Sequence, residues 1–170
     1  MGYLSGMVEA ERGLYTTLSS ALPSLSRPLY ECILTGVPPV ASGITHNGVT
    51  RLSLHDSIFH LARAAGKRTA AAAYHWVSEL YNQSPWQAAR DRFTHDERLP
   101  IQHGCFYWDD GYPDSHLLMD GEWLRSQYDP DFLLIHPMGV DDAGHQFGLD
   151  SRQYRNQARR MDSLLADLLP

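Results

Sequence analysis

Apolar residues recur at helical spacing along several stretches of the chain. This pattern predicts helices over residues 3–11, 28–35, 56–65, 114–128 and 151–169. Within 56–65 the predicted inward face comprises Ile58, Leu61, Ala62 and Ala65, and Gly66 ends the helix. Within 151–169 the predicted inward face comprises Tyr154, Ala158, Met161, Leu164, Leu165 and Leu168.

Other segments have the pattern of strands or loops. Residues 131–137 are continuously apolar and end at a proline, which predicts a buried strand. Residues 69–75 are rich in alanine, but they follow a helix stop, so we predict a second buried strand. β-Branched and aromatic residues predict a strand over 14–20, whereas 43–51 and the polar stretch 84–112 are predicted as a loop and a long surface excursion.

Strands that alternate with helices indicate an α/β fold with a mainly parallel sheet, and residues 1–170 fit one domain. In such folds ligands bind at the carboxyl ends of the strands. Here those ends lead into the segment that carries Ser26, the loop after His75 and the loop "HPMGVDDAGHQFG". We therefore expect these three segments to share one edge of the sheet.

Composition and charge narrow the possible partners. Hydrophobic residues make up 43% of the chain and charged residues 20%, as in ordinary globular proteins, and no apolar run is long enough to span a bilayer. A net charge of −6 argues against nucleic acid, and an acidic protein that binds phosphate usually needs a metal ion at the site. The two cysteines, Cys32 and Cys105, form no metal-binding or disulfide pattern and slightly favour a reducing compartment such as the cytoplasm, although the localisation stays open.

The motif "DDAGH" supplies a candidate metal site. Asp141 and His145 are four residues apart just after the strongest predicted strand, and a carboxylate and an imidazole are both good zinc ligands. Asp91 and His95 have the same spacing, but they lie in the polar stretch rather than at a strand end. Position therefore favours the first pair.

Ser26 has two interpretations. It is either the N-cap of a helix that begins with a proline and ends at Gly36, or a hydroxyl at a helix N-terminus that meets an anion. The sequence has neither a G-x-S-x-G elbow nor a GxxxxGK[ST] loop, so a metal ion is the remaining means of activating the hydroxyl. Asn47 is likewise either a turn residue or an anion ligand.

Taken in order, these motifs resemble a known family. "LPSLSRPLYECILTGVPPVASGITHN", "SIFHLARAAGKRTAAAAYHW" and "DPDFLLIHPMGVDDAGHQFGLDSRQY" resemble the nucleophile segment, a following helix and strand, and the metal loop of the type I phosphodiesterase/nucleotide pyrophosphatase family of the alkaline phosphatase superfamily. The resemblance implies a three-layer α/β/α fold and hydrolysis of phosphate esters or anhydrides.

The resemblance also implies roles for particular residues. Ser26 matches the hydroxyl nucleophile, Asn47 the phosphate-binding amide, and Asp141 and His145 the ligands of one of two zinc ions. Arg27 replaces an aromatic residue of the nucleotide pyrophosphatases, so we expect it to bind phosphate and to favour a dianionic monoester. The helix amides after Ser26 are expected to hold charge on the phosphate oxygens.

The family pattern contains further metal ligands before and after the segments that match. We therefore expect this chain to correspond to the middle of a larger catalytic domain, whose unpaired sheet edges favour self-association. The alternatives are an inactive fragment that keeps the fold and binds an anion or a partner, a sulfatase, and an α/β domain in which Ser26 and Asn47 are only a cap and a turn. The predicted substrate is a small phosphorylated compound, with neither nucleic acid nor membrane as a partner.

Overall fold

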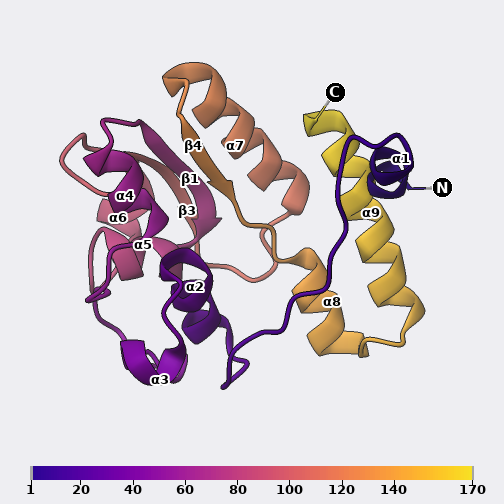
Figure 1. Ribbon diagram of the computed structural model, residues 1–170, viewed down its shortest axis with the longest axis horizontal. Coiled ribbons are helices and arrows are strands. Elements are labelled where there is room, and N and C mark those ends of the chain that lie inside the picture. Colours follow the sequence, from indigo (N-terminus) through magenta and orange to yellow (C-terminus); the bar gives the residue numbers. More distant parts are fainter. Residues whose placement is uncertain (1, 170) are drawn as a thin grey trace.

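The computed structural model describes residues 2–169 (Figure 1). Within this range the helices are α1 (Tyr3–Glu9), α2 (Ser26–Thr35), α3 (Pro39–Ser42), α4 (Ile58–Ala64), α5 (His75–Tyr81), α6 (Ala88–Asp91), α7 (Asp114–Tyr128), α8 (Gly139–Phe147) and α9 (Arg152–Leu168). The strands are β1 (Thr69–Tyr74), β2 (Phe93–His95), β3 (His103–Tyr107) and β4 (Phe132–Ile135).

The strands form one mainly parallel sheet in the order β2-β3-β1-β4. β1 lies in the middle and pairs in parallel with both β3 and β4, so that Ala72 is opposite Cys105 on one side and Ile135 on the other. β2 is antiparallel to β3 at the edge. The carboxyl ends of β1, β3 and β4 therefore lie together at one edge of the sheet, as the predicted parallel arrangement requires.

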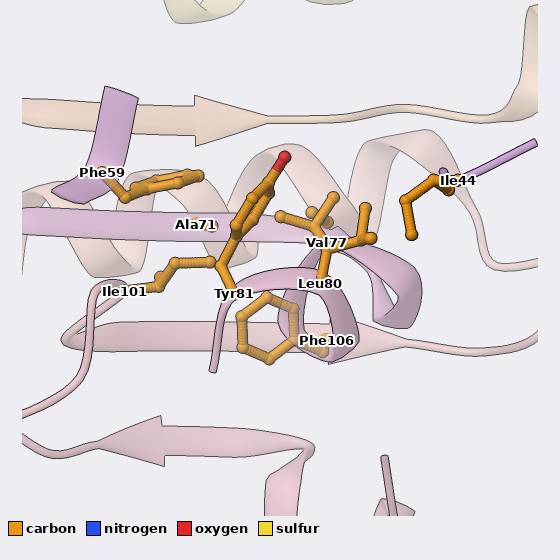
Figure 2. Close-up of a cluster of buried hydrophobic side chains, with 9 residues drawn as sticks. Ile44, Phe59, Ala71, Val77, Leu80, Tyr81, Ile101 and Phe106 are labelled. Carbon is orange, nitrogen blue, oxygen red and sulfur yellow. The ribbon is translucent and has the colours of Figure 1, made fainter. Parts of the chain in front are cut away.

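Helices cover both faces of this sheet, which confirms the three-layer α/β/α fold (Figure 1). On one face Phe59 of α4 and Val77, Leu80 and Tyr81 of α5 pack against Ala71 of β1 and Phe106 of β3 (Figure 2). On the other face Leu117 and Leu124 of α7 pack against Ala70, Ala72 and Cys105. The alanines of β1 are completely buried, and their small side chains allow helices to approach both sides of the strand.

The structure confirms most predicted elements, with shifts of a few residues at their ends. The predicted 114–128 helix is α7, and the predicted strands at 69–75 and 131–137 are β1 and β4. The 56–65 helix begins two residues later than predicted because Ser57 is its N-cap and forms a capping box with His60. Its buried residue is Phe59, whereas the predicted inward residues Ile58 and Leu61 are 41% and 62% exposed, so the predicted face was wrong.

The predicted strand over 14–20 was wrong. Residues 11–20 are irregular and exposed, and Leu14, Tyr15 and Leu18 are each more than 80% exposed. β-Branched and aromatic side chains favour a strand only when a neighbouring strand supplies hydrogen bonds and a surface to pack on. No strand among the described residues pairs with this segment.

The interpretation of 84–112 as a surface excursion was also wrong, because this stretch contains β2 and the completely buried strand β3. The five residues of β3 are apolar or small apart from His103, and the charged residues around them conceal this short run in the sequence. The segment after β4, predicted as a loop, is the helix α8. Gly139, Gly144 and Gly148 favour a loop in this segment. The segment is helical because its apolar and polar residues alternate at helical spacing, so that one side of the helix packs on the protein.

The long C-terminal helix is present as α9, but it is only partly covered. None of its residues is buried, and Ala158, which was predicted to face inward, is exposed. α9 packs against α7 and α8 on one side and against α1 on the other (Figure 1). None of the helices in the described part of the chain is both long and apolar enough to cross a bilayer.

Candidate active site

A cavity of about 310 Å³ lies at the carboxyl edge of the sheet. The N-terminus of α2, the loop that carries Asn47, the end of β1 and helix α8 surround it. Its lining residues are Ser26, Tyr30, Asn47, Tyr74, Trp76, Asp110, Met138, Asp141, Asp142 and His145. The structure therefore brings Ser26, Asn47, Asp141 and His145 together, although more than a hundred positions separate the first from the last.

Ser26 is the first residue of α2, and Leu25 is the N-cap. The N-cap interpretation of Ser26 was therefore wrong. The α2 N-terminus has no side-chain cap, and no hydrogen bond within residues 2–169 engages the Ser26 hydroxyl. The hydroxyl is thus available at the positive end of the helix, facing the cavity.

Asn47 is held against the first turn of α2. Its Oδ1 accepts a hydrogen bond of 3.0 Å from the backbone N–H of Arg27. The next residue, Pro28, has no N–H, so the helix amides after Ser26 are not free for an anion as we had expected. The donors that remain at this end are the Ser26 N–H and the side-chain NH₂ group of Asn47.

The guanidinium of Arg27 is buried, and Arg27 is not among the residues that line the cavity. Its Nη2 lies 2.6 Å from Oε2 of Glu79 on α5, and both side chains are at most 6% exposed. Its Nη1 donates to the carbonyl of Val49 at 3.2 Å, and its Cζ lies 4.7 Å from the ring centre of Trp76. We call this set of contacts the Arg27 clamp, because it fixes the serine turn to the asparagine loop and to α5.

Asp141 and His145 lie one turn apart on α8. Oδ2 of Asp141 is 3.6 Å from Nε2 of His145, and both side chains are more than half exposed. A carboxylate and an imidazole at this separation fit a divalent metal ion as two of its ligands, but a catalytic zinc ion normally has three protein ligands. Residues 2–169 hold no group of three or more candidate ligands, so Asp141 and His145 do not by themselves complete such a site.

The competing pair Asp91 and His95 does not converge on a metal site. The Asp91 carboxylate pairs with Arg90 and accepts a hydrogen bond from the Gln87 N–H. His95 instead faces His103, with their Nδ1 atoms 3.0 Å apart.

The cavity is rich in acidic groups. The carboxylates of Asp110, Asp141 and Asp142 line it, and Glu79 already neutralises Arg27. A phosphate group would be repelled here without a cation. The residues that are present therefore favour a metal ion as the partner of an anionic substrate.

Two tyrosines supply neutral donors to the same cavity. Burial raises the pKa of Tyr30, and the charge of Asp141 raises it further. Burial together with the neighbouring Asp110 raises the pKa of Tyr74 to about 12. Both phenols stay protonated at neutral pH and can donate hydrogen bonds to an anion.

Several residues that line the cavity, and Glu79 behind it, were not found by sequence reasoning. Tyr74 is the last residue of β1, so its position at the end of a predicted strand could have identified it. Asp142 is the neighbour of Asp141 in "DDAGH", so the motif could have identified it as well. Asp110 follows β3 within the misinterpreted stretch 84–112, and finding it requires knowledge of that strand. Glu79 shows no signal in the sequence, because its role depends on a partner that lies far away along the chain.

Comparison with known proteins places this geometry in a family. The model of the type I phosphodiesterase / nucleotide pyrophosphatase family matches residues 4–170. The chain belongs to this family. The resemblance inferred from its motifs is thus confirmed, and with it a fold of the phosphodiesterase and pyrophosphatase hydrolase type in the alkaline phosphatase superfamily.

Two relatives illustrate the breadth of the family. The human GPI ethanolamine phosphate transferase 2, catalytic subunit, is 24% identical over 165 residues, which is 97% of this chain and 16% of the human protein. The structure of murine ectonucleotide pyrophosphatase/phosphodiesterase 5, an inactive variant in complex with AMP, matches with a TM-score of 0.61 and 15% identity. That match covers 89% of this chain and 42% of the murine chain, so this chain spans less than half of either relative.

Proposed function

We propose that this chain carries part of the catalytic site of a metal-dependent hydrolase of phosphate esters or anhydrides, with Ser26 as the nucleophile. The observation that carries the proposal is that the free hydroxyl of Ser26 shares one cavity with Asn47, Asp141 and His145, in a member of this family. The ectonucleotide pyrophosphatase that shares the fold binds a nucleotide, AMP, which supports a small phosphorylated substrate.

In this mechanism the Ser26 oxygen attacks phosphorus, and the bond from phosphorus to the leaving oxygen breaks. Water then hydrolyses the phosphoserine, so two inversions give net retention at phosphorus. The Asn47 NH₂ group and the neutral phenols of Tyr30 and Tyr74 donate to the phosphate oxygens. Asp141 and His145 would hold a divalent metal ion such as zinc, which when bound lowers the pKa of a nearby hydroxyl and offsets phosphate charge.

The test is hydrolysis of 4-nitrophenyl phosphate and bis(4-nitrophenyl) phosphate by the purified chain, after chelation and with zinc restored. We expect Ser26→Ala to lower zinc-dependent turnover by about a thousandfold or more, because the nucleophile is lost. Ser24→Ala, two residues away and exposed, is the matched control and should retain full turnover. Equal rates in the two variants would remove Ser26 from the mechanism.

If the chain binds zinc but the wild type turns over neither ester, the non-catalytic alternative holds. In that case the chain keeps the fold and binds an anion or a partner. Isothermal titration with zinc and then with inorganic phosphate separates this outcome from a failure to bind metal. Loss of phosphate affinity in Asn47→Ala would then identify the same cavity as an anion site.

A second candidate is transfer of the phosphoryl group to an alcohol rather than to water. The similarity to the human ethanolamine phosphate transferase over 97% of this chain favours it. Both reactions pass through a covalent phosphate ester on the Ser26 oxygen, and they differ only in the acceptor. Turnover in the presence of glycerol, with products counted by phosphorus NMR, separates them: a transferase forms more glycerol ester than the mole fraction of glycerol predicts.

A further inference from the structure

The outer edge of β4 carries backbone groups without partners. β4 is the last strand in the sheet order, and β1 is its only neighbour among the described strands. The N–H groups of Phe132 and His136 donate to carbonyls on the β1 side. Because successive residues of a strand direct their N–H and C=O groups to opposite sides, those of Leu133 and Ile135 point outward. No hydrogen bond from elsewhere in residues 2–169 reaches either residue.

This edge lacks the features that usually protect the end of a sheet. Native proteins place charged side chains, proline or a bulge on an edge strand, whereas the four residues of β4 are apolar and half-buried. Phe132 and Leu134 pack on one face of the sheet, and Leu133 and Ile135 pack on the other. Unpaired backbone groups in such surroundings cost free energy, so the edge favours the addition of another strand.

The same chain holds a free segment with the composition of a strand. Residues 13–26 contain no charged side chain, and 14–20 are rich in β-branched and aromatic residues. Leu14, Tyr15 and Leu18 are 84–91% exposed, and no backbone hydrogen bond among the described residues engages 14–20. Figure 1 shows this stretch in indigo between α1 and α2, apart from β4. Moving it from its present position would therefore break few contacts.

Two copies of the chain can satisfy both features together. Each copy has one open edge and one free segment, so a mutual exchange closes with two-fold symmetry and leaves neither unpaired. The segment 14–20 is longer than the four residues of β4 and can span the edge. Leu14, Thr16 and Leu18 would share one face of the added strand, because alternate residues do. The exposed side chains of two copies, with the edges they cover, reach the roughly 1,000 Å² that a specific interface needs.

We propose that this chain forms a strand-exchanged dimer, in which residues 14–20 of each copy add a strand to the β4 edge of the other. The backbone groups of Leu133 and Ile135 bond to that added strand, and its leucines pack beside β4. A pairing of β4 with β4 of a second copy would use the same edge but leave 14–20 free. The inference is independent of the proposed function.

The first test measures the mass of the full chain by light scattering after size-exclusion chromatography, over a wide range of protein concentration. We expect a dimer. The double variant Thr16→Pro/Thr17→Pro removes two successive N–H groups, one of which faces β4 in any register. It should raise the dissociation constant about tenfold or more, while the single chain loses no hydrogen bond.

A second variant keeps this test independent of proline. Leu18→Ser should weaken the dimer in the same direction, whereas Leu54→Ser should leave it unchanged, because Leu54 is a similarly exposed leucine outside the segment. A monomer at every concentration would overturn the proposal. So would a dimer that persists in the double proline variant, which is the result expected for β4 paired with β4.

The second test locates the contact by amide hydrogen exchange, followed by NMR. In the dimer the amide protons of Leu133 and Ile135 should exchange slowly, and Thr16→Pro/Thr17→Pro should speed their exchange about tenfold or more. The amide protons of Phe132 and His136 bond within the sheet and should stay slow in both proteins. Fast exchange at Leu133 and Ile135 in the wild-type dimer, or slow exchange that the variant leaves unchanged, would overturn the assignment.

Discussion

The ion pair with Glu79 determines where the charge of Arg27 lies. The sequence places a cation beside the candidate nucleophile and so predicts a phosphate ligand, but the structure turns the guanidinium into the α5 side of the fold. The charge is neutralised there, while the backbone N–H of the same residue holds Asn47 in place. Arg27 is thus in a position to orient the site without lining the cavity.

Breaking the Arg27 clamp should be costly. Removing one partner of a buried ion pair leaves an uncompensated charge, so Glu79→Ala should lower the free energy of unfolding by about 3–5 kcal/mol. Lys67→Ala removes the exposed Lys67–Asp131 pair and should cost at most about 1 kcal/mol. Urea unfolding followed by tryptophan fluorescence measures both. A cost for Glu79→Ala no larger than that of the exposed control would contradict the clamp.

The way elements approach one another depends on a few small residues. Gly121 allows α7 to lie against β4, since a Cβ atom there would be 2.5 Å from Cδ1 and 2.8 Å from Cγ1 of Ile135. β4 leads directly towards α8 and the Asp141–His145 pair. The seating of α7 on the sheet therefore helps to set the position of the candidate metal ligands.

Gly121→Ala should destabilise the protein by about 1–3 kcal/mol through overpacking, despite the better helix propensity of alanine. Shortening the neighbour in the double variant Gly121→Ala/Ile135→Val should restore part of this loss. Gly6→Ala in α1, where nothing lies within 4 Å of the added atom, is the control and should not destabilise. Chemical denaturation gives these values. The contact would have no role if the double variant were as unstable as the sum of the two single ones.

Whether an element could be predicted from the sequence depends on whether its signal is local or comes from contacts with other elements. Continuous apolar runs, as at β4, and helical periodicity, as at α7, are local signals, and they identified these elements. β3 was missed because its buried run is short and is recognised only by its pairing with β1. Sequence motifs identified four residues of the cavity, namely Ser26, Asn47, Asp141 and His145. Asp110 and Glu79 could not be found in this way, because their place in the site depends on contacts between segments that are far apart along the chain.

At the scale of the whole molecule, three histidines lie buried or partly buried in separate parts of the fold. Burial lowers the pKa of His75 on α5, of His103 on β3 and of His136 after β4. The charges that face His103 come from His95, Arg68 and Arg63, with Glu97 opposing them. Each imidazole therefore resists protonation more strongly in the folded chain than in the unfolded chain.

Stability should consequently fall as the pH drops below the unfolded histidine value of about 6.5. The unfolded chain binds more protons than the folded chain in this range, so acidification favours unfolding, and the full contribution is present only above that pH. Urea midpoints between pH 5 and pH 8 measure the effect. His103→Gln should flatten the profile, whereas the exposed His116→Gln should not. A midpoint independent of pH would contradict the buried neutral state.

The two ends of the described chain depend on each other. The Asp162 carboxylate of α9 accepts hydrogen bonds from the backbone N–H groups of Tyr3 and Leu4, and α1 buries no residue of its own. During synthesis, α1 emerges from the ribosome before α9, so its hydrogen-bond partner Asp162 is absent until residue 162 has followed. α1 is thus made well before the helix that holds it, and until then it is open to proteases and chaperones.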